Sequence, residues 1–525
     1  MTEQTNIFTE FNKDPRQCEE VTLDVGTLTL AQFIAVARYH AKLILSDAYI
    51  EKITQSRRLV DTFVNEGRAI YGVTTGLGDN VRKAIDPDES EMLQINTLRS
   101  HAVAVGTPLQ EEAVRAIQLM ILVNFGKGYS GVSIETIQLL KEFLNRRLFP
   151  YAPSEGSVGY LSVEAHICLP LIGEGKIWYK GKLMGSTDVL KEEKLSPIHL
   201  KCKEGLALIQ GSTSVTALAV LALYNAVTVV KNAEIGGALS FESLKGTVKA
   251  LDNRIHQVKD HIEQAETAQN LRAILAHSEI MEQNKNAKLQ DALPLRCFPH
   301  ILGAIKRVLQ ETWNSVYEEM NSCSDNPIIL PDTHATDVLM CGNFDATYVG
   351  LHMDSMSIAM GNLAKLLERF VDRLTNRHLN DLPPFLTENP GLNNGLMILQ
   401  YTAAGLTGEI KILSHPSSVD SIPTCANQED VVSFGYFASK KAYEISKKLE
   451  NILAIQLVTA VTALDFIRDL KPSPVVQELY KLIRQKVPKI DKDRYFFKDI
   501  EMMQKLIHER VLTQCIDDQI GYTNY

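Results

Sequence analysis

The sequence predicts a mainly helical, all-α fold with long helices at its centre, and two observations support this. Between residues 160 and 470, apolar residues recur with helical spacing and almost no strand alternation. Within this region, the stretches 206–231, 346–367 and 451–465 carry few charged residues. A surface helix keeps a polar face, so helices this apolar should be buried on several sides. These three are expected to form the core of a central bundle.

Residues 1–205 are expected to form a helix-rich N-terminal part. The stretch from Thr22 to Leu30 predicts a short hairpin that turns at Gly26. Helical periodicity predicts the helices that follow, at 31–67, 88–104, 108–125 and 133–147.

Two glycine-containing loops lie in this N-terminal part. Residues 71–80 contain three glycines and predict a mobile loop, and loops on rigid scaffolds often carry function. Residues 154–159 have glycines on both sides of Ser157 and Val158 and lead into an apolar helix. The N-terminus of that helix would offer free N–H groups and a positive dipole end to a negative charge.

Residues 206–470 are expected to form the long-helix bundle, and residues 471–525 a C-terminal helical part. The stretch 206–230 lacks charge, but its hydroxyl and amide side chains are too many for a lipid-facing span. It is predicted to be a core helix. Amphipathic patterns predict the surrounding helices, at 246–284, 296–320, 393–413 and 428–450, with longer loops at 322–343 and 381–394.

Composition excludes several classes of function. The net charge of −9 argues against a nucleic-acid partner, which would need a basic face. The eight cysteines form no CxxC pair and are expected to be buried, reduced thiols. The first 20 residues lack the layout of a signal peptide, so a cytoplasmic location is expected. No metal-binding, GxSxG or P-loop motif is present, so no metal is expected.

The stretch from Ser154 to Gly175 resembles the histidine and aromatic amino-acid ammonia-lyase family. In that family, Gly-Ser-Val-Gly is followed by Ala-Ser-Gly, Asp-Leu and a Leu-Pro-Leu-Ile-Gly-Glu-Gly tail. The Ala-Ser-Gly cyclises into a methylidene-imidazolone, the electrophile that captures the substrate amine. Here the flanks match, but Tyr160 follows Gly159 directly, so three residues are missing. Either a modified tripeptide has been left out of the sequence, or the protein works without the ring.

Further motifs along the chain extend this resemblance and imply the roles of site residues. Tyr71, in Tyr-Gly-Val-Thr-Thr-Gly-Leu-Gly, matches a catalytic tyrosine that acts as a base. Arg296, in a block that begins at Gln290, matches the clamp for the substrate carboxylate. Phe344 matches an aromatic residue at the reacting centre. The residues implied to bind substrate are His101, Tyr160, Gln210, Gln290, Asn326, Asp345, Met397 and Glu429.

Three departures from the family pattern surround the expected ring. The tripeptide and its following Asp are missing, Gln210 replaces an Asn, and Leu293 replaces a Tyr. Loss of the ring together with the residues that surround it predicts a change of chemistry. A trimethylammonium group leaves directly as trimethylamine, so the profile resembles ergothionase, which converts ergothioneine to thiourocanate. On this prediction Tyr71 is the base and no cofactor is needed.

Two alternatives remain open. The first is a histidine ammonia-lyase, converting histidine to urocanate and ammonia, whose cyclised Ala-Ser-Gly has been left out of the sequence. The second is a catalytically silent homologue kept for binding or assembly. The resemblance also implies an ammonia-lyase/fumarase-like elongated helical bundle. It implies a homotetramer with active sites shared between chains, acting on a small molecule and not at a membrane.

Overall fold

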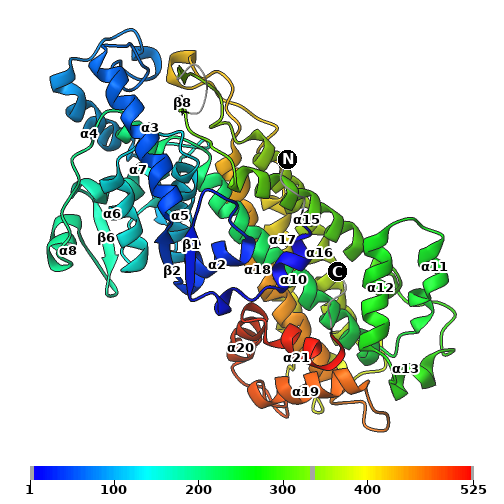
Figure 1. Ribbon diagram of the computed structural model, residues 1–525. Helices are drawn as coiled ribbons and strands as arrows, with labels where there is room; N and C mark the ends of the chain where they lie inside the picture. Colours follow the sequence, from blue (N-terminus) through cyan, green and yellow to red (C-terminus); the bar gives the residue numbers. More distant parts are fainter. Residues whose placement is uncertain (1–4, 332–336, 522–525) are drawn as a thin grey trace.

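The computed structural model describes residues 5–331 and 337–521, and its three longest helices pack side by side. The longest of the described helices, α10 (Thr213–Ser243), is buried along its whole length. It packs against α18 (Gly435–Leu464) and α16 (Thr347–Thr375), and α16 packs in turn against α15 (Phe298–Met320). Figure 1 shows this bundle between the N-terminal part, at upper left, and α11 to α13, at lower right. The mainly helical bundle predicted from the sequence is confirmed.

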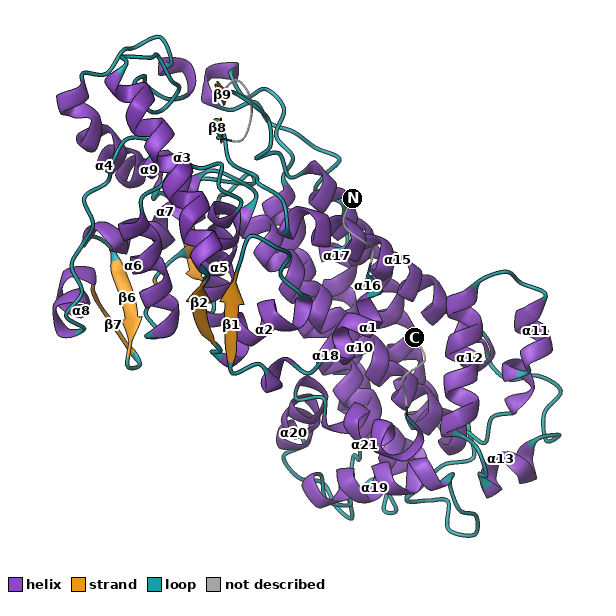
Figure 2. Ribbon diagram, in the orientation of Figure 1, coloured by secondary structure: helices purple, strands orange, loops and turns teal. Residues whose placement is uncertain are grey.

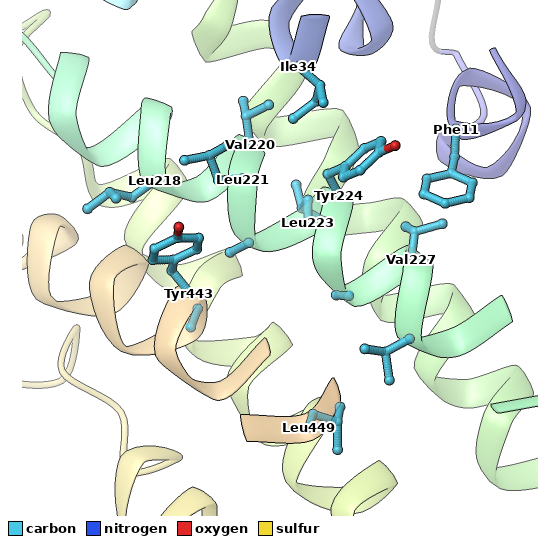
Figure 3. Packing of buried hydrophobic residues seen from close by; sticks show 14 of the residues in the cluster. Phe11, Ile34, Leu218, Val220, Leu221, Leu223, Tyr224, Val227, Tyr443 and Leu449 are labelled. Atoms are coloured by element: carbon cyan, nitrogen blue, oxygen red, sulfur yellow. The ribbon is translucent and has the colours of Figure 1, made fainter. Parts of the chain in front are cut away.

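Close contact within the bundle depends on two adjacent glycines of α10. A Cβ at Gly237 would lie 2.7 Å from the Phe298 ring of α15, and one at Gly236 would collide with Gln456 of α18. Figure 3 shows aliphatic side chains of α10 packed between Ile34 of α2 (Leu30–Tyr39) and Tyr443 of α18. Helices can approach this closely only where a side chain is missing from the contact.

The stretch 204–243 contains a segment long and apolar enough to cross a membrane, with a mean hydropathy of 1.8. That segment is entirely buried in the structure. Neighbouring helices therefore provide the apolar environment that it needs, as predicted for a core helix.

Residues 22–30 do not form the predicted hairpin. Strand β1 (Glu20–Leu23) pairs in parallel with β2 (Lys42–Leu45), and α2 connects the two. Thr29 and Gln32 form a capping box that starts α2 where the second hairpin strand was expected. The single helix predicted at 31–67 is divided into two. His40 adopts a left-handed conformation that ends α2, and a second helix, α3 (Asp47–Asn65), follows.

The other elements before α10 are mostly short (Figure 2). They are α1 (Ile7–Asn12), α4 (Ser90–His101), β3 (Val105–Pro108), α5 (Glu111–Gly126), α6 (Ile134–Asn145), β4 (Phe149–Pro150), β5 (Pro153–Glu155), α7 (Ser162–Cys168), β6 (Lys176–Tyr179), β7 (Lys182–Gly185), α8 (Ser186–Glu192) and α9 (Glu204–Ile209). Helices α4, α5 and α6 confirm three of the predicted helices. Strand β3 pairs with β5, and β4, β6 and β7 form an antiparallel sheet.

Beyond α10, the predicted helix 246–284 is broken into short pieces. Asp252 and Ser278 act as N-caps whose side chains accept backbone N–H groups and so start new helices. The elements of this half are α11 (Asn253–Gln257), α12 (Ile262–Ile274), α13 (Glu279–Asn284), α14 (Leu293–Arg296), β8 (Ile328–Leu330), β9 (Asp337–Leu339), α17 (Met397–Leu413), α19 (Pro474–Lys486), α20 (Phe497–His508) and α21 (Val511–Ile520). The predicted segments 428–450 and 451–465 are joined in the single helix α18. Residues 332–336, within the predicted loop 322–343, lie outside the described residues.

Short 3-10 helices connect many of these elements. They lie at Pro15–Gln17, Gly78–Asn80, Pro87–Glu89, Leu169–Ile172, Val248–Leu251, Pro384–Leu386 and Cys425–Asn427. The expectation of buried cysteines is wrong for most of them. Only Cys168 is fully buried, six are partly exposed, and Cys425 is exposed.

One face of α16 and α17 is apolar and open in the single chain. Its side chains are 47–78% exposed, and they are Tyr348, Leu351, Ile358, Ile398, Tyr401 and Ile412. The stretch 346–367 is therefore buried against α15 and α18 but not on this face, contrary to the expectation that it is covered on several sides. Exposed apolar surface of this extent is typical of a surface that contacts another protein chain.

Candidate active site

A cavity of about 760 Å³ lies where the N-terminal part meets one end of the bundle. Its walls come from the loop 71–80, the end of α4, the loop before α7, and segments next to α9, α15 and α16. Seven of the residues predicted from the sequence line it, namely Tyr71, His101, Tyr160, Gln210, Asn326, Phe344 and Glu429. Segments far apart in the sequence thus bring most of the predicted site together.

Tyr71 is held at the cavity wall by its own glycine-rich loop. The backbone N–H of Gly78 donates a hydrogen bond to the Tyr71 hydroxyl oxygen, at 2.8 Å. Burial raises the pKa of Tyr71, the Gly78 N–H opposes this, and the nearby Glu429 carboxylate raises the pKa further. An N–H donor stabilises a phenolate, so this is the arrangement expected of a base that must lose its proton before it acts.

Gly78 also has to remain a glycine for steric reasons. Its φ is +55°, and a Cβ there would lie 2.5 Å from the sulfur of Cys425. Cys425, Ala426 and Asn427 are themselves all left-handed, with φ between 50° and 66°. Backbone strain of about 1–3 kcal/mol per residue persists where the surroundings enforce it, often at functional sites. The sequence prediction included none of these three residues.

The strained turn at Cys425 positions Glu429 in the cavity wall. It is closed by a hydrogen bond from the Thr424 N–H to the Glu429 carbonyl, at 2.7 Å. One carboxylate oxygen of Glu429 accepts hydrogen bonds from the Thr424 hydroxyl, at 3.2 Å, and from the Tyr160 hydroxyl, at 3.3 Å. The carboxylate is thereby directed toward the aromatic side of the cavity.

The loop that leads into α7 ends in a γ-turn. Leu161 has a φ of 80° and a ψ of −67°, and the Ser162 N–H donates to the Tyr160 carbonyl at 3.2 Å. A γ-turn with positive φ is rare and strained. Gly159, with a φ of 151°, precedes it, and α7 begins at Ser162 as expected from the glycine loop and apolar stretch.

The γ-turn places Tyr160 against Phe344 in the cavity wall. The two rings meet edge to face, with centroids 5.1 Å apart. Tyr160 is 6% exposed, and burial together with Glu429 raises its pKa well above the usual value for a tyrosine. The Tyr160 hydroxyl is therefore protonated at neutral pH.

His101 and Asn326 are both fixed by backbone groups. The Nδ1 atom of His101 lies 2.7 Å from the Thr97 carbonyl, so it carries the hydrogen and leaves Nε2 as an acceptor. Asn326 uses its side-chain oxygen to accept the Cys341 N–H, at 2.8 Å. Because that oxygen is occupied, the amide nitrogen of Asn326 remains as a donor toward the cavity that the residue lines.

Four predicted residues do not line the cavity. Asp345 is exposed next to the wall residue Phe344, where its carboxylate accepts the Thr347 N–H and raises the pKa of Tyr160. Arg296 and Gln290 are hydrogen-bonded to each other at 2.8 Å, before the start of α15. The 23 residues of α15 rise about 35 Å and separate Arg296 from Asn326.

The fourth of these residues, Met397, begins α17. Helix α17 is 17 residues long, and the loop that carries Glu429 follows its C-terminal end. A helix of this length rises about 25 Å. A single chain therefore lacks Arg296, Gln290 and Met397 at its cavity.

The chain does not supply the residues that the methylidene-imidazolone requires. That ring forms from Ala-Ser-Gly, and the backbone here passes from Gly159 directly to Tyr160 and then into the γ-turn at Leu161. The Tyr160 ring occupies the cavity wall at this point. The residues present therefore do not fit this prosthetic group.

Comparisons with known proteins agree on a single family. The family model for aromatic amino acid lyases matches residues 28–485. A histidine ammonia-lyase from Caldanaerobacter subterraneus subsp. tengcongensis is 40% identical over 95% of this chain and 99% of its own length. The crystal structure of histidine ammonia-lyase from Trypanosoma cruzi is 34% identical, with a TM-score of 0.89, and the match covers 96% of this chain and 98% of that one.

An ergothionase also has the same fold. The crystal structure of the Treponema denticola enzyme, in complex with desmethyl-ergothioneine sulfonic acid, is 26% identical with a TM-score of 0.86. That match covers 94% of this chain and 99% of the other.

The expectation that this chain is an ergothionase is wrong. Curated relatives that are 39–40% identical over nearly the whole chain are histidine ammonia-lyases, which favours the alternative interpretation. Of the three departures, the deletion at Tyr160 and the change at Gln210 lie at the cavity, whereas Leu293 lies before α15, away from it. These departures do not by themselves specify which nitrogen leaves. From its sequence match and its fold, the chain belongs to the aromatic amino acid lyase family.

Proposed function

We propose that this carbon–nitrogen lyase removes the α-amino group of histidine, giving urocanate and ammonia. The similarity to histidine ammonia-lyases supports this substrate. The observation that carries the proposal is the meeting of Tyr71, His101 and Glu429 around one cavity. They provide a base, an imidazole acceptor and a carboxylate, which suit a substrate that loses a β-hydrogen and carries a hydrogen-bonding ring.

The proposed roles follow from the contacts of each residue. The Nε2 atom of His101 accepts the N–H of the substrate imidazole, and the amide nitrogen of Asn326 donates to the substrate carboxylate. Tyr71, as a phenolate stabilised by the Gly78 N–H, takes a β-hydrogen as a proton. The C–N bond then breaks with its electron pair on nitrogen, and the double bond of urocanate forms.

The proposal includes a homotetramer in which further copies complete each cavity. Arg296 lies at the opposite end of α15 from Asn326, so an antiparallel second copy brings its own Arg296 to this cavity. The exposed apolar face of α16 and α17 supplies a surface for such contacts. The guanidinium of the second copy then clamps the substrate carboxylate. With eight unpaired cysteines, we place the enzyme in the cytoplasm.

Incubation of the purified protein with L-histidine tests this function. We expect the near-ultraviolet absorbance of urocanate to rise together with released ammonia, in equal amounts. The trimethyl betaine of histidine serves as the comparison substrate. Release of trimethylamine from the betaine, with no ammonia from histidine, would overturn the proposal.

A further inference from the structure

Tyr160 stands at the place in the chain where relatives of this family build their electrophile. The backbone reaches this position through a positive-φ γ-turn, and Tyr160 contacts both Phe344 and Glu429. A small side chain at position 160 would be enough to complete a loop this short. Instead, a strained backbone holds a large aromatic ring against a carboxylate, which indicates that the ring has a function there.

We propose that Tyr160 and Glu429 hold the α-ammonium group of the substrate as a cation, so that ammonia leaves directly and no protein electrophile captures it. This inference rests on the proposed function and specifies the form of the substrate that the site takes. Tyr160 becomes a substrate-binding residue in place of the prosthetic ring.

The surroundings of Tyr160 favour a bound cation. The Tyr160 and Phe344 rings stand at 76° to each other, so their faces form a corner, and ring faces attract ammonium groups. The Glu429 carboxylate adjoins this corner, and Asp345 lies close enough to raise the pKa of Tyr160. Among the described residues that line the cavity, the lysine is Lys83, which follows the loop 71–80 in sequence.

The electrons and atoms of the reaction balance without an added reactant. Tyr71 phenolate takes one β-hydrogen as a proton and becomes a neutral phenol. The electrons of that C–H bond form the new double bond, and those of the C–N bond leave with the nitrogen. The –NH₃⁺ group departs as neutral NH₃ and keeps its three hydrogens.

Tyr160 does not act as an acid in this scheme. Loss of its proton would place a buried phenolate beside the Glu429 carboxylate, and the two negative charges would repel each other. A substrate that is already an ammonium needs no proton from the protein. The hydroxyl instead donates to Glu429 and fixes the direction of the carboxylate.

The first test asks whether the active protein contains an electrophile. We expect the intact mass to equal that of the 525-residue chain, 58.5 kDa, and urocanate formation to survive treatment with cyanide or borohydride. Both reagents add to an imidazolone. Urocanate formation that cyanide abolishes, or a mass increased by a cyclised tripeptide, would overturn this inference and leave the proposed function standing. Failure of the untreated protein to produce urocanate would instead count against the proposed function.

The second test asks whether Tyr160 contacts the ammonium group. The variants Tyr160→Leu and Tyr160→Phe are compared for binding of histidine and of imidazolepropionate, which lacks the amino group. We expect Tyr160→Leu to weaken histidine binding at least tenfold with little change for imidazolepropionate, and Tyr160→Phe to lose only a few-fold. Tyr495→Leu, at a 68% exposed tyrosine outside the cavity, is the matched control. Equal weakening of both ligands by Tyr160→Leu would assign Tyr160 a structural role only.

Discussion

The Tyr71 hydroxyl has two opposing neighbours. The Gly78 N–H favours the phenolate, whereas burial and Glu429 favour the neutral phenol, and the net result is a pKa above the usual value near 10. A substrate ammonium and a guanidinium from a second copy would shift the balance toward the phenolate. In the absence of substrate, the base is therefore mainly protonated at neutral pH.

The activity should depend on the charge state of Tyr71. Below the pKa of a base, the active fraction grows tenfold with each pH unit, so kcat/KM is expected to rise from pH 7 until the α-amino group of free histidine loses its proton, because the site takes the ammonium form. Tyr71→Phe should lower kcat by about 10²- to 10⁴-fold and abolish this rise. Steady-state kinetics over that pH range provide the measurement. A variant that keeps the wild-type pH profile would exclude Tyr71 as the base.

The contact between two loops determines how the Gly78 N–H is presented. The loop 71–80 and the 3-10 helix at Cys425–Asn427 meet where the Gly78 backbone faces the sulfur of Cys425. The sequence identified the loop 71–80 but not the turn at Cys425–Asn427, and the contact between them depends on the tertiary structure.

A pair of variants tests this contact. Gly78→Ala should lower kcat at least tenfold, because relief of the clash with Cys425 moves the N–H away from Tyr71. It should also destabilise the fold by about 1–2 kcal/mol through the left-handed alanine. Adding Cys425→Gly should restore part of the lost kcat. If the double variant is no more active than Gly78→Ala alone, the steric explanation fails.

Packing within the bundle can be tested in the same way at α10. Gly237→Ala places a methyl group against Phe298 and should destabilise the protein by about 1–3 kcal/mol, although alanine is the better helix former. Phe298→Leu in the same chain removes the clash. The loss of stability in the double variant should therefore be smaller than the sum of the losses in the two single variants, as measured by thermal unfolding.

At the scale of the whole molecule, a single chain places three of the predicted site residues away from the cavity. Arg296, Gln290 and Met397 do not line the cavity that contains Tyr71, and one face of α16 and α17 exposes apolar side chains. Both features have one physical explanation if copies pack through this face. The contact covers apolar surface and brings a cation to the substrate carboxylate at the same time.

Mixed assemblies test this arrangement directly. Tyr71→Phe and Arg296→Ala should each be inactive alone, because each lacks one group required in every cavity. When the two are produced together, random association should give both wild-type groups in about one quarter of the cavities. Recovered urocanate formation near that fraction supports shared cavities. A mixture as inactive as its components would place Arg296 outside the site.

The sequence by itself determined the helical class, the family resemblance and seven of the residues that line the cavity. Helical periodicity is a property of neighbouring residues, so the helical class could be predicted without coordinates, and Tyr71, His101 and Glu429 were named from motifs that resemble the family. Element boundaries were less accurate. The predicted hairpin at Thr22–Leu30 is absent because a capping box and a parallel partner strand compete with it.

Only the tertiary structure decided how these residues act together. The γ-turn at Leu161, the left-handed turn at Cys425 and the edge-to-face contact of Tyr160 with Phe344 depend on segments far apart in the chain. The leaving group also could not be determined from three local substitutions. A motif specifies which side chains are present, whereas the distances and charges between them arise only when the chain packs.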